Sequence, residues 1–308
     1  MTWKVNIMEI RQEIQALKEA RNAVILAHYY VEPAVQEIAD YVGDSFFLSK
    51  KAVSLPQKTI VFCGVSFMGE SAKLLNPEKT VLLPDPSADC SMAHMADPET
   101  IQALRQQWDD LAVVCYINST AALKACADVC VTSSNAVDIV RALPQHNILF
   151  LPDRNLARFV AAQVPEKHII LPSGCCPTHD RMQAEQVRDL QRQHPGALVL
   201  AHPECPPEVT ALADYVGSTA GILSFAAKSD GTEFIICTEH GIRHPLAVEN
   251  PNKRFYFPAT TPICPDMKRI TLEQIRDVLK NGGQPVEVDG TLSQTAKKPL
   301  DEMLRLAK

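Results

Sequence analysis

Short apolar runs recur along the chain, and each is followed by a polar turn and a helical segment. Residues 23–27, 111–115 and 197–201 form runs that are too short and too uniformly apolar for exposed strands. Runs of this kind are typical of parallel strands buried on both faces. Further strands are predicted at residues 59–63, 79–83, 147–151, 168–171, 233–237 and 254–257, with a short one at 286–288.

Helical segments alternate with these strands. Ile7, Ile10, Ile14 and Leu17 have the spacing of one apolar helix face, so residues 1–22 are predicted to contain an amphipathic helix rather than a signal peptide or anchor. Other helices are predicted at 33–41, 66–75, 98–108, 183–194 and 272–279. Strands that alternate with helices indicate parallel sheets covered on both faces, with right-handed crossovers.

The pattern occurs three times. His28 and His202 lie 174 positions apart, as do Asp40 and Asp214, and Tyr116 lies 88 after the first histidine and 86 before the second. The repeat predicts an α/β fold of three pseudo-threefold-related αβα sandwich domains, whose parallel sheets surround a central active site. The expected domains are residues 1–90, 91–177 and 178–265, and residues 266–308 are expected to return and complete or cover the first domain.

Composition narrows the class of protein. The chain has 308 residues, 46% of them hydrophobic and 21% charged, as in an ordinary soluble globular protein. Its net charge of −6, without a basic run, argues against a nucleic-acid partner. No apolar run is long enough to span a bilayer. Ten cysteines without an export signal indicate a reducing, cytoplasmic location.

Candidate site residues follow the strands in sets of three. In open parallel sheets, ligands bind beyond the carboxyl ends of the strands. The first strand of each unit ends at His28, Tyr116 or His202; two residues later come Tyr30, Asn118 or Glu204; the next helix is preceded by Ser45, Ser133 or Thr219. The second strand of each unit leads into Gly64-Val65-Ser66, Pro152-Asp153-Arg154 or Thr238-Glu239-His240.

A common axis for the three domains would bring these side chains to one cavity. One strand-end side chain is more often structural than functional, and the hydroxyl groups have an alternative role as N-caps. However, the three copies mix imidazole, phenol, amide and carboxylate groups, which favours proton transfer and polar substrate binding.

A cysteine follows the third strand of every unit. Cys90, Cys176 and Cys264 are separated by 86 and 88 positions, whereas the rivals Cys175 and Cys205 have no counterparts in the other units. Structural zinc normally takes four ligands, often in close Cys-x-x-Cys pairs. A [4Fe–4S] cluster on three thiolates leaves one iron free to act as a Lewis acid. The spacing favours the cluster over zinc, and an unligated thiol trio comes third.

Several motifs between residues 23 and 279 together resemble the quinolinate synthase A family. They are His28-Tyr29-Tyr30, Gly43-Asp44-Ser45, Tyr116-Ile117-Asn118-Ser119-Thr120, Gly174-Cys175-Cys176-Pro177-Thr178-His179, His202-Pro203-Glu204-Cys205, Gly217-Ser218-Thr219, Thr238-Glu239-His240-Gly241 and Cys264-Pro265-Asp266-Met267-Lys268. The resemblance implies that iminoaspartate and dihydroxyacetone phosphate condense to quinolinate, the pyridine precursor of NAD, with loss of phosphate and two waters. It also implies a [4Fe–4S] cluster on Cys90, Cys176 and Cys264.

The resemblance further implies a set of site residues. Substrate contacts are expected at His28, Ser45, Tyr116, Ile117, Asn118, Ser133, His202, Pro203, Glu204 and Thr219, with Tyr30 and His179 nearby. We expect Glu204 to act as general acid–base, assisted by Tyr30, Tyr116 and His202. Two features depart from the family pattern: Cys175 adds a thiol beside Cys176, and a C-terminal Cys-x-x-Cys-x-x-Cys motif is absent.

Partners and alternatives follow from the same resemblance. It implies small-molecule substrates, with functional coupling to an L-aspartate oxidase that supplies iminoaspartate. One alternative is another [4Fe–4S] hydro-lyase of the aconitase kind, which would act on a hydroxy acid. A non-catalytic iron–sulfur sensor would need a basic helix or a spare binding domain, and the sequence shows neither. A structural zinc protein would contain zinc and lack absorbance from iron and sulfur.

Overall fold

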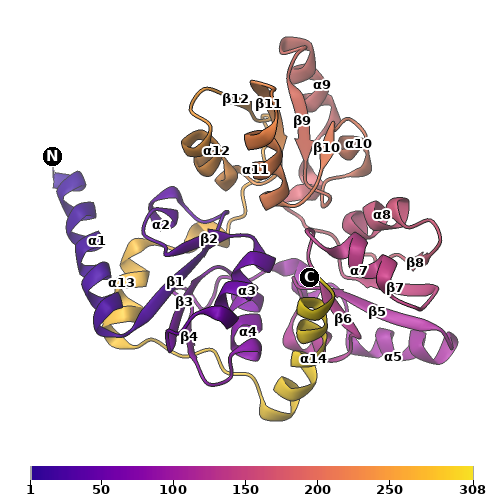
Figure 1. The fold of residues 1–308 in the computed structure, drawn as a ribbon, viewed down its shortest axis with the longest axis horizontal. Helices are drawn as coiled ribbons and strands as arrows, with labels where there is room; N and C mark the ends of the chain where they lie inside the picture. The colour runs from indigo at the N-terminus through magenta and orange to yellow at the C-terminus, as the bar shows by residue number, and fades with distance from the viewer. Residues whose placement is uncertain (1, 308) are drawn as a thin grey trace.

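Three parallel sheets form the framework of the protein. The computed structural model describes residues 2–307, and Figure 1 shows three groups of strands around a common centre. Each sheet has four strands, in the orders β2-β1-β3-β4, β6-β5-β7-β8 and β10-β9-β11-β12. The predicted fold class is confirmed. The strands are β1 Ala23–His28, β2 Tyr41–Gly43, β3 Thr59–Cys63, β4 Thr80–Leu82, β5 Leu111–Tyr116, β6 Val129–Val131, β7 Asn147–Leu151, β8 His168–Ile170, β9 Leu198–Ala201, β10 Tyr215–Val216, β11 Glu233–Cys237 and β12 Arg254–Tyr256.

Helices cover the faces of these sheets. Every residue of β1 and β5 is buried, as expected for strands with helices on both sides. The first predicted domain contains α1 Thr2–Ala20, α2 Pro33–Gln36, α3 Ser45–Ser54 and α4 Ser66–Leu75. The second predicted domain contains η1 Ser91–His94, α5 Pro98–Gln107, α6 Ala121–Ala125, α7 Ala136–Ala142 and α8 Arg154–Gln163. The rest are η2 His179–Arg181, α9 Ala184–Gln193, α10 Pro207–Thr210, α11 Thr219–Lys228, η3 His240–Ile242, α12 Arg243–Glu249, η4 Met267–Arg269, α13 Leu272–Asn281 and α14 Gly290–Leu306.

One predicted helix is wrong in its second half. The helix expected at 33–41 ends at Gln36, and Tyr41–Gly43 forms β2 instead. The cause is the repeated aspartate before this strand. The Asp40 carboxylate accepts a hydrogen bond from the Ile25 backbone N–H at 2.8 Å, and this contact holds the segment in parallel register with β1.

The same contact recurs in the other two sheets. Asp128 accepts from Val113 N and Asp214 accepts from Val199 N, both at 2.7 Å. The aspartate repeated in the three units therefore has a structural role, because each copy satisfies a backbone N–H of a central strand.

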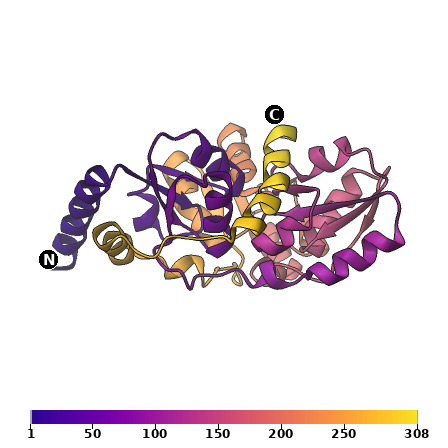
Figure 2. The same cartoon turned by 90° about the horizontal axis from the view of Figure 1, so that it is seen from below.

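The C-terminal segment contacts two domains. Helix α13 packs against α1, and Val286 N donates to Val81 O at 2.8 Å beside an isolated antiparallel bridge between Leu82 and Pro285. The strand predicted at 286–288 is therefore wrong, since only a single bridge forms. Helix α14 packs against α4 and α6, in the seam visible in Figure 2.

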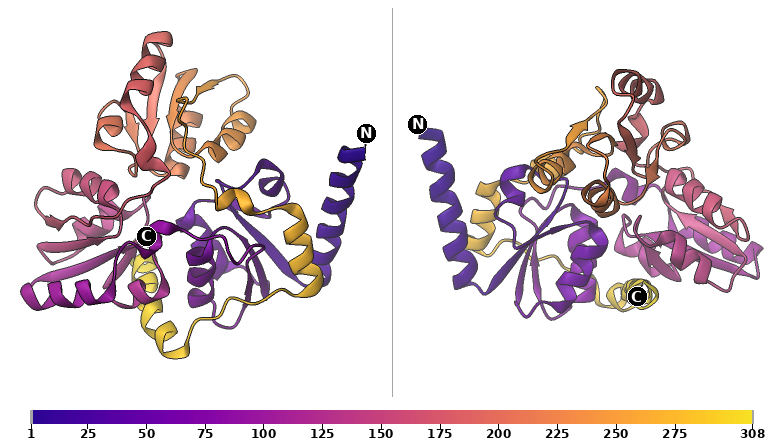
Figure 3. Two further views of the ribbon diagram at one scale, coloured as in Figure 1. Left: turned by 180° about the vertical axis from the view of Figure 1, so that it is seen from behind. Right: turned by 45° about the horizontal axis from the view of Figure 1, so that its top comes forward.

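The apolar core also crosses that seam. Buried residues of the first two sheets form one contiguous cluster that includes Ala296, Leu300 and Met303 of α14. Two smaller clusters cover the faces of the third sheet. Each sheet lies within one predicted domain, but the domain boundaries stay a prediction. Figure 3 shows α14 between the first and second domains from two further directions.

No helix that could cross a bilayer is found among the described residues, because none combines the necessary length with sufficient apolar character.

Candidate active site

A cavity lies where the carboxyl ends of the three sheets meet. Residues from all three domains line it. Most of the predicted site residues lie in its wall: His28, Tyr30, Ser45, Cys90, Tyr116, Asn118, Ser133, Cys176, His179, His202, Glu204, Thr219 and Cys264. Ile117 and Pro203 are buried beside it but do not line it, so their contact with a substrate stays a prediction.

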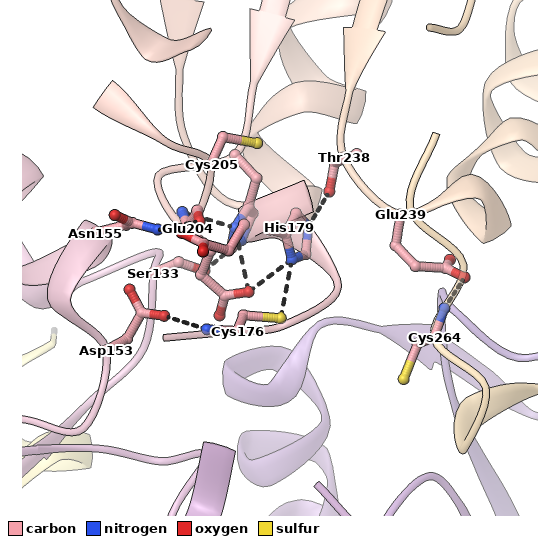
Figure 4. Close-up of polar contacts among 12 residues, drawn as sticks. Ser133, Asp153, Asn155, Cys176, His179, Glu204, Cys205, Thr238, Glu239 and Cys264 are labelled. Atoms are coloured by element: carbon pink, nitrogen blue, oxygen red, sulfur yellow. Dashed lines mark hydrogen bonds and ion pairs between the residues drawn. The ribbon is translucent and has the colours of Figure 1, made fainter. Parts of the chain in front are cut away.

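The buried carboxylate of Glu204 is the centre of the site. The Tyr116 hydroxyl donates to Glu204 Oε1 at 2.6 Å, and His179 Nδ1 lies 2.8 Å from Glu204 Oε2. His202 Nδ1 is 3.8 Å from the same oxygen. The Asn155 side chain donates to the Glu204 carbonyl oxygen at 3.0 Å and so ties α8 of the second domain to this loop of the third. Figure 4 shows Glu204 with His179 and Asn155.

Hydrogen bonds continue from Glu204 across the cavity to Tyr30. His179 Nε2 lies 3.0 Å from Thr238 Oγ1, which is 3.1 Å from the Tyr30 hydroxyl. That hydroxyl is in turn 2.7 Å from Thr219 Oγ1. When His179 is neutral, its Nδ1–H donates to the carboxylate, so its Nε2 accepts from Thr238. Thr238 then accepts from Tyr30, and a directed chain joins groups of two domains.

The protonation states follow from burial and from these partners. Burial opposes ionisation of Glu204, but His179, His202 and the Tyr116 hydrogen bond outweigh it and hold the pKa of Glu204 below its usual range. Burial lowers the pKa of both His28 and His202 to about 3. Burial, with the Glu204 charge, raises the pKa of Tyr30 and Tyr116 well above its ordinary value. At neutral pH the Glu204 carboxylate thus lies among the neutral imidazoles of His28 and His202 and the neutral phenols of Tyr30 and Tyr116.

Three hydroxyl groups lie near helix starts but do not cap those helices. The N-cap of α3 is Asp44, which accepts from Phe47 N at 2.9 Å, and the N-cap of α11 is Ser218, which accepts from Gly221 N at 3.1 Å. The N-cap alternative is therefore wrong for Ser45 and Thr219. Ser133 precedes α7, and its hydroxyl lies 3.2 Å from His202 Nε2. All three hydroxyl groups remain available to the cavity.

The thiols of Cys90, Cys176 and Cys264 line the same cavity. Each belongs to the loop that follows the third strand of its repeat unit. Cys205 is only 1% exposed and its thiol donates to the Cys237 carbonyl, so it belongs to the core. Cys175 lies outside the lining. Burial raises the pKa of Cys90 to about 12, with the Glu204 and Cys264 charges adding to it, and burial likewise raises the pKa of Cys176 and Cys264. These thiols would therefore release their protons on binding a metal.

The donor set fits a metal centre. Three thiolates without a fourth suit iron–sulfur ligation that leaves one position open, and soft thiolates also suit zinc. Cys176, His179 and Glu204 form a second group whose ligand atoms all lie within 4.8 Å of one another. However, His179 Nδ1 and Glu204 Oε2 are 2.8 Å apart. Ligands bound to one tetrahedral metal at about 2.0 Å would stand roughly 3.3 Å apart, so this pair is arranged as a hydrogen bond.

The residues after the second strands were expected near the cavity, but sequence reasoning did not predict that they hold these loops in place. Thr238 and the carboxylates of Asp153 and Glu239 are fully buried beside the cavity. Lys268 Nζ donates to the Tyr30 carbonyl at 2.7 Å. Gly241 allows the third domain to approach that loop, because a Cβ atom there would lie 2.6 Å from the Tyr29 carbonyl oxygen. The signal for these residues was position alone: Asp153 and Glu239 lie two residues after the ends of the second strands of their units.

Comparison with known proteins gives the family. A sequence profile described as "Quinolinate synthetase A protein" matches residues 12–305. The chain belongs to the quinolinate synthetase A family. The resemblance predicted from the motifs is thereby confirmed, and the chain is an enzyme of this family.

Relatives named "Quinolinate synthase" match over nearly the full chain. The protein from Fusobacterium nucleatum is 52% identical over 298 residues, which cover 97% of this chain and 99% of the relative. The protein from Caldicellulosiruptor bescii is 51% identical over 302 residues, covering 98% and 100% of the two chains. The protein from Clostridioides difficile is 47% identical over 299 residues, covering 97% and 98%.

Proposed function

We propose that this chain is a quinolinate synthase. Iminoaspartate and dihydroxyacetone phosphate would condense and lose one phosphate and two waters, leaving the aromatic ring of quinolinate. Together with the family, the observation that carries the proposal is the cavity itself, where one thiol from each domain lies beside the hydrogen-bonded Glu204. Such a cavity offers both a metal centre and proton-transfer groups, and these dehydrations need both.

The thiols of Cys90, Cys176 and Cys264 would hold a [4Fe–4S] cluster. When bound, the cluster supplies one iron without a protein ligand, which is a Lewis acid for the loss of water. The support for this assignment is that the thiol set is complete with three members from three domains and that all three face one cavity.

Two helix starts and a polar side chain without a partner would bind the substrates. The starts of α3 and α11 open on the cavity beside Ser45 and Thr219, and the free N–H groups of a helix start favour carboxylate or phosphate. The buried Asn118 Oδ1 has no hydrogen-bond partner within residues 2–307. A buried acceptor without a partner is costly, so we assign it to a substrate N–H or O–H.

Glu204, Tyr30 and Tyr116 would carry out proton transfer. The ionised Glu204 accepts a proton from the carbon or nitrogen that loses it and returns it to a departing hydroxyl group. Tyr116 donates to Glu204 directly, and Tyr30 reaches it through Thr238 and His179. The neutral imidazoles of His28 and His202 orient substrate oxygens by hydrogen bonds without adding charge.

The proposed substrate also indicates its source. An imine such as iminoaspartate is hydrolysed in water, so a reaction that oxidises aspartate must supply it nearby. We therefore propose functional coupling to an L-aspartate oxidase in the cytoplasm.

An anaerobic assay tests the proposal. Protein reconstituted with iron and sulfide is mixed with freshly generated iminoaspartate and dihydroxyacetone phosphate, and quinolinate is measured by chromatography. Quinolinate formation that requires both substrates is expected. Iron-loaded protein that forms no quinolinate but dehydrates a hydroxy acid would overturn the proposal in favour of an aconitase-like hydro-lyase.

A further inference from the structure

A carboxylate oxygen binds the backbone N–H of each of the three cavity cysteines. Cys90 N donates to Asp89 Oδ1 at 2.8 Å and Cys176 N donates to Asp153 Oδ2 at 2.8 Å. Cys264 N donates to Glu239 Oε1 at 3.1 Å. Figure 4 shows the contacts of Cys176 and Cys264. The three contacts thus fix the backbone at the three positions where a ligand side chain leaves the loop.

Asp153 and Glu239 each bind a second backbone group with their other oxygen. Asp153 Oδ1 accepts from Leu156 N at 2.6 Å, where α8 begins. Glu239 Oε2 accepts from Gly241 N at 2.5 Å, where η3 begins. Each carboxylate therefore joins a helix start to a cysteine loop. Both side chains are 0% exposed, a costly place for a carboxylate unless both oxygens have partners.

The two residues occupy the same place in the repeat. They lie 86 positions apart, each two residues after the end of its strand, β7 or β11. The residue after each donates its N–H to a carbonyl two positions before the cysteine: Arg154 to Gly174 at 2.8 Å, and His240 to Pro262 at 2.9 Å. The same strand–loop contact therefore frames both carboxylates.

The first domain has a different arrangement. Ser66 N donates to Ala88 O at 2.9 Å, which aligns Val65 with the two carboxylates of the other domains. Valine has no acceptor, and Asp89, held by the Ser66 hydroxyl, binds Cys90 N instead. The side chain of Asp89 is 45% exposed. Two of the three loops therefore depend on buried carboxylates, and the third depends on a surface one.

We propose that Asp153 and Glu239 are positioning residues that hold the Cys176 and Cys264 loops so that both thiols face the cavity. That these two residues support a metal cluster rests on the proposed function. Their positioning of the two loops can be measured without a metal. A helix cap alone needs one carboxylate oxygen. In both domains the second oxygen goes to the cysteine, as expected for groups that orient metal ligands.

Two variants test this in the full-length protein, Asp153→Ala and Glu239→Ala. The metal-free chain is treated with iodoacetamide, and the rate at each cysteine is followed by mass spectrometry. The expected result is reciprocal: the rate at Cys176 rises at least about fivefold in the first variant only, and the rate at Cys264 rises similarly in the second only. Release of a loop exposes its own thiol and leaves the other loop clamped.

Iron retention gives a second readout. After anaerobic reconstitution, loss of iron to a chelator should be about 10- to 100-fold faster in both variants than in the parent. Asp97→Ala is the matched control. Asp97 accepts from Thr100 N at 2.8 Å as the N-cap of α5, so this variant loses a helix cap without touching a cysteine loop. It should alkylate and retain iron as the parent does.

Several results would overturn the inference. Unchanged alkylation rates would do so, and so would a parallel rise at both cysteines in either variant, which would indicate general loosening. If the alanine variants do not fold, Asp153→Asn and Glu239→Gln keep the volume and should give the same reciprocal pattern at smaller size. A parent that holds no iron would contradict the proposed function, while the alkylation pattern would still decide the positioning role.

Discussion

Replacing Glu204 with glutamine is the sharpest test of the proton-transfer site. Glutamine keeps the volume, and its carbonyl oxygen can still accept from Tyr116, which now donates to the carboxylate at 2.6 Å. Its amide group would then face His179 Nδ1, 2.8 Å from the present carboxylate oxygen, and two donors would meet. A change of the His179 tautomer would relieve this contact but would turn Nε2 into a donor toward Thr238. Thus the loss of one charge also disturbs the chain to Tyr30.

The expected loss of turnover is large. A positioned general acid–base group contributes about 10²- to 10⁴-fold, or roughly 3 to 5 kcal/mol of transition-state stabilisation. We expect Glu204→Gln to lower kcat by that factor while the iron content stays that of the parent, because the three cavity thiols are untouched. Initial rates of quinolinate formation, normalised to bound iron, give the measurement.

Glu70→Gln is the matched control. Glu70 is a partly buried carboxylate that accepts from Ala121 N at 2.9 Å and does not line the cavity. This variant should keep the parent rate. A Glu204→Gln protein with full iron and a kcat within threefold of the parent would refute the assignment. A variant that loses its iron would instead indicate that the carboxylate binds the metal with Cys176 and His179.

Four further predictions follow from the same geometry. Cys176→Ser should lose bound iron and its visible absorbance, whereas Cys175→Ser should keep both, because only Cys176 lines the cavity. Thr238→Val should lower kcat at least about tenfold with little change in bound iron, and Thr238→Ser should recover most of it, because the hydroxyl links Tyr30 to His179. Between pH 6.5 and about 3 the unfolded chain protonates His202 and the folded chain does not, so stability falls with falling pH by up to about 1.4 kcal/mol per pH unit. His202→Gln should flatten the slope of urea-unfolding free energy against pH by that amount. Asp214→Ala should lower the free energy of unfolding by about 1 to 3 kcal/mol in urea titrations, because it leaves Val199 N without its acceptor.

Each of these has a clear contrary outcome. Equal iron in the two serine variants would remove Cys176 from the ligand set. A Thr238→Ser protein as slow as Thr238→Val would show that packing matters and not the hydroxyl. Identical pH slopes would mean that His202 titrates normally in the folded chain. For the strand contact, Asp230→Ala alters an exposed aspartate of the same domain, and equal losses in both variants would contradict a specific role of Asp214.

The repeat made much of the site predictable. Offsets of 88 and 86 positions placed His28, Tyr116 and His202 at equivalent strand ends, and the structure puts all three in the wall of one cavity. Similar offsets, 86 and 88 positions, favoured Cys176 over Cys175 as the partner of Cys90 and Cys264, a preference that no spacing within a single unit would have given. The order of strands and helices was predictable because the central strands are uniformly apolar runs. The structure buries every residue of β1 and β5, as such runs predict.

What the sequence did not reveal depends on contacts between distant residues. Strand β2 has three residues, and its pairing depends on the Asp40 carboxylate rather than on an apolar pattern. Asp153 and Glu239 were expected near the cavity, but their full burial and their contacts with the cysteine loops were not, because charge normally predicts a surface. Helix α14 has an apolar face, and the sequence predicted that it would cover the first domain. Nothing in the sequence indicates that this face also packs against α6 of the second domain.

The most direct test is an iron and acid-labile sulfide count on anaerobically purified protein, made beside the Cys90→Ser, Cys176→Ser and Cys264→Ser variants. About four irons and four sulfides per parent chain, with loss of the cluster in each variant, are the result expected if each domain contributes one ligand. Zinc in place of iron, or a cluster that survives in any one of the three variants, would contradict that arrangement.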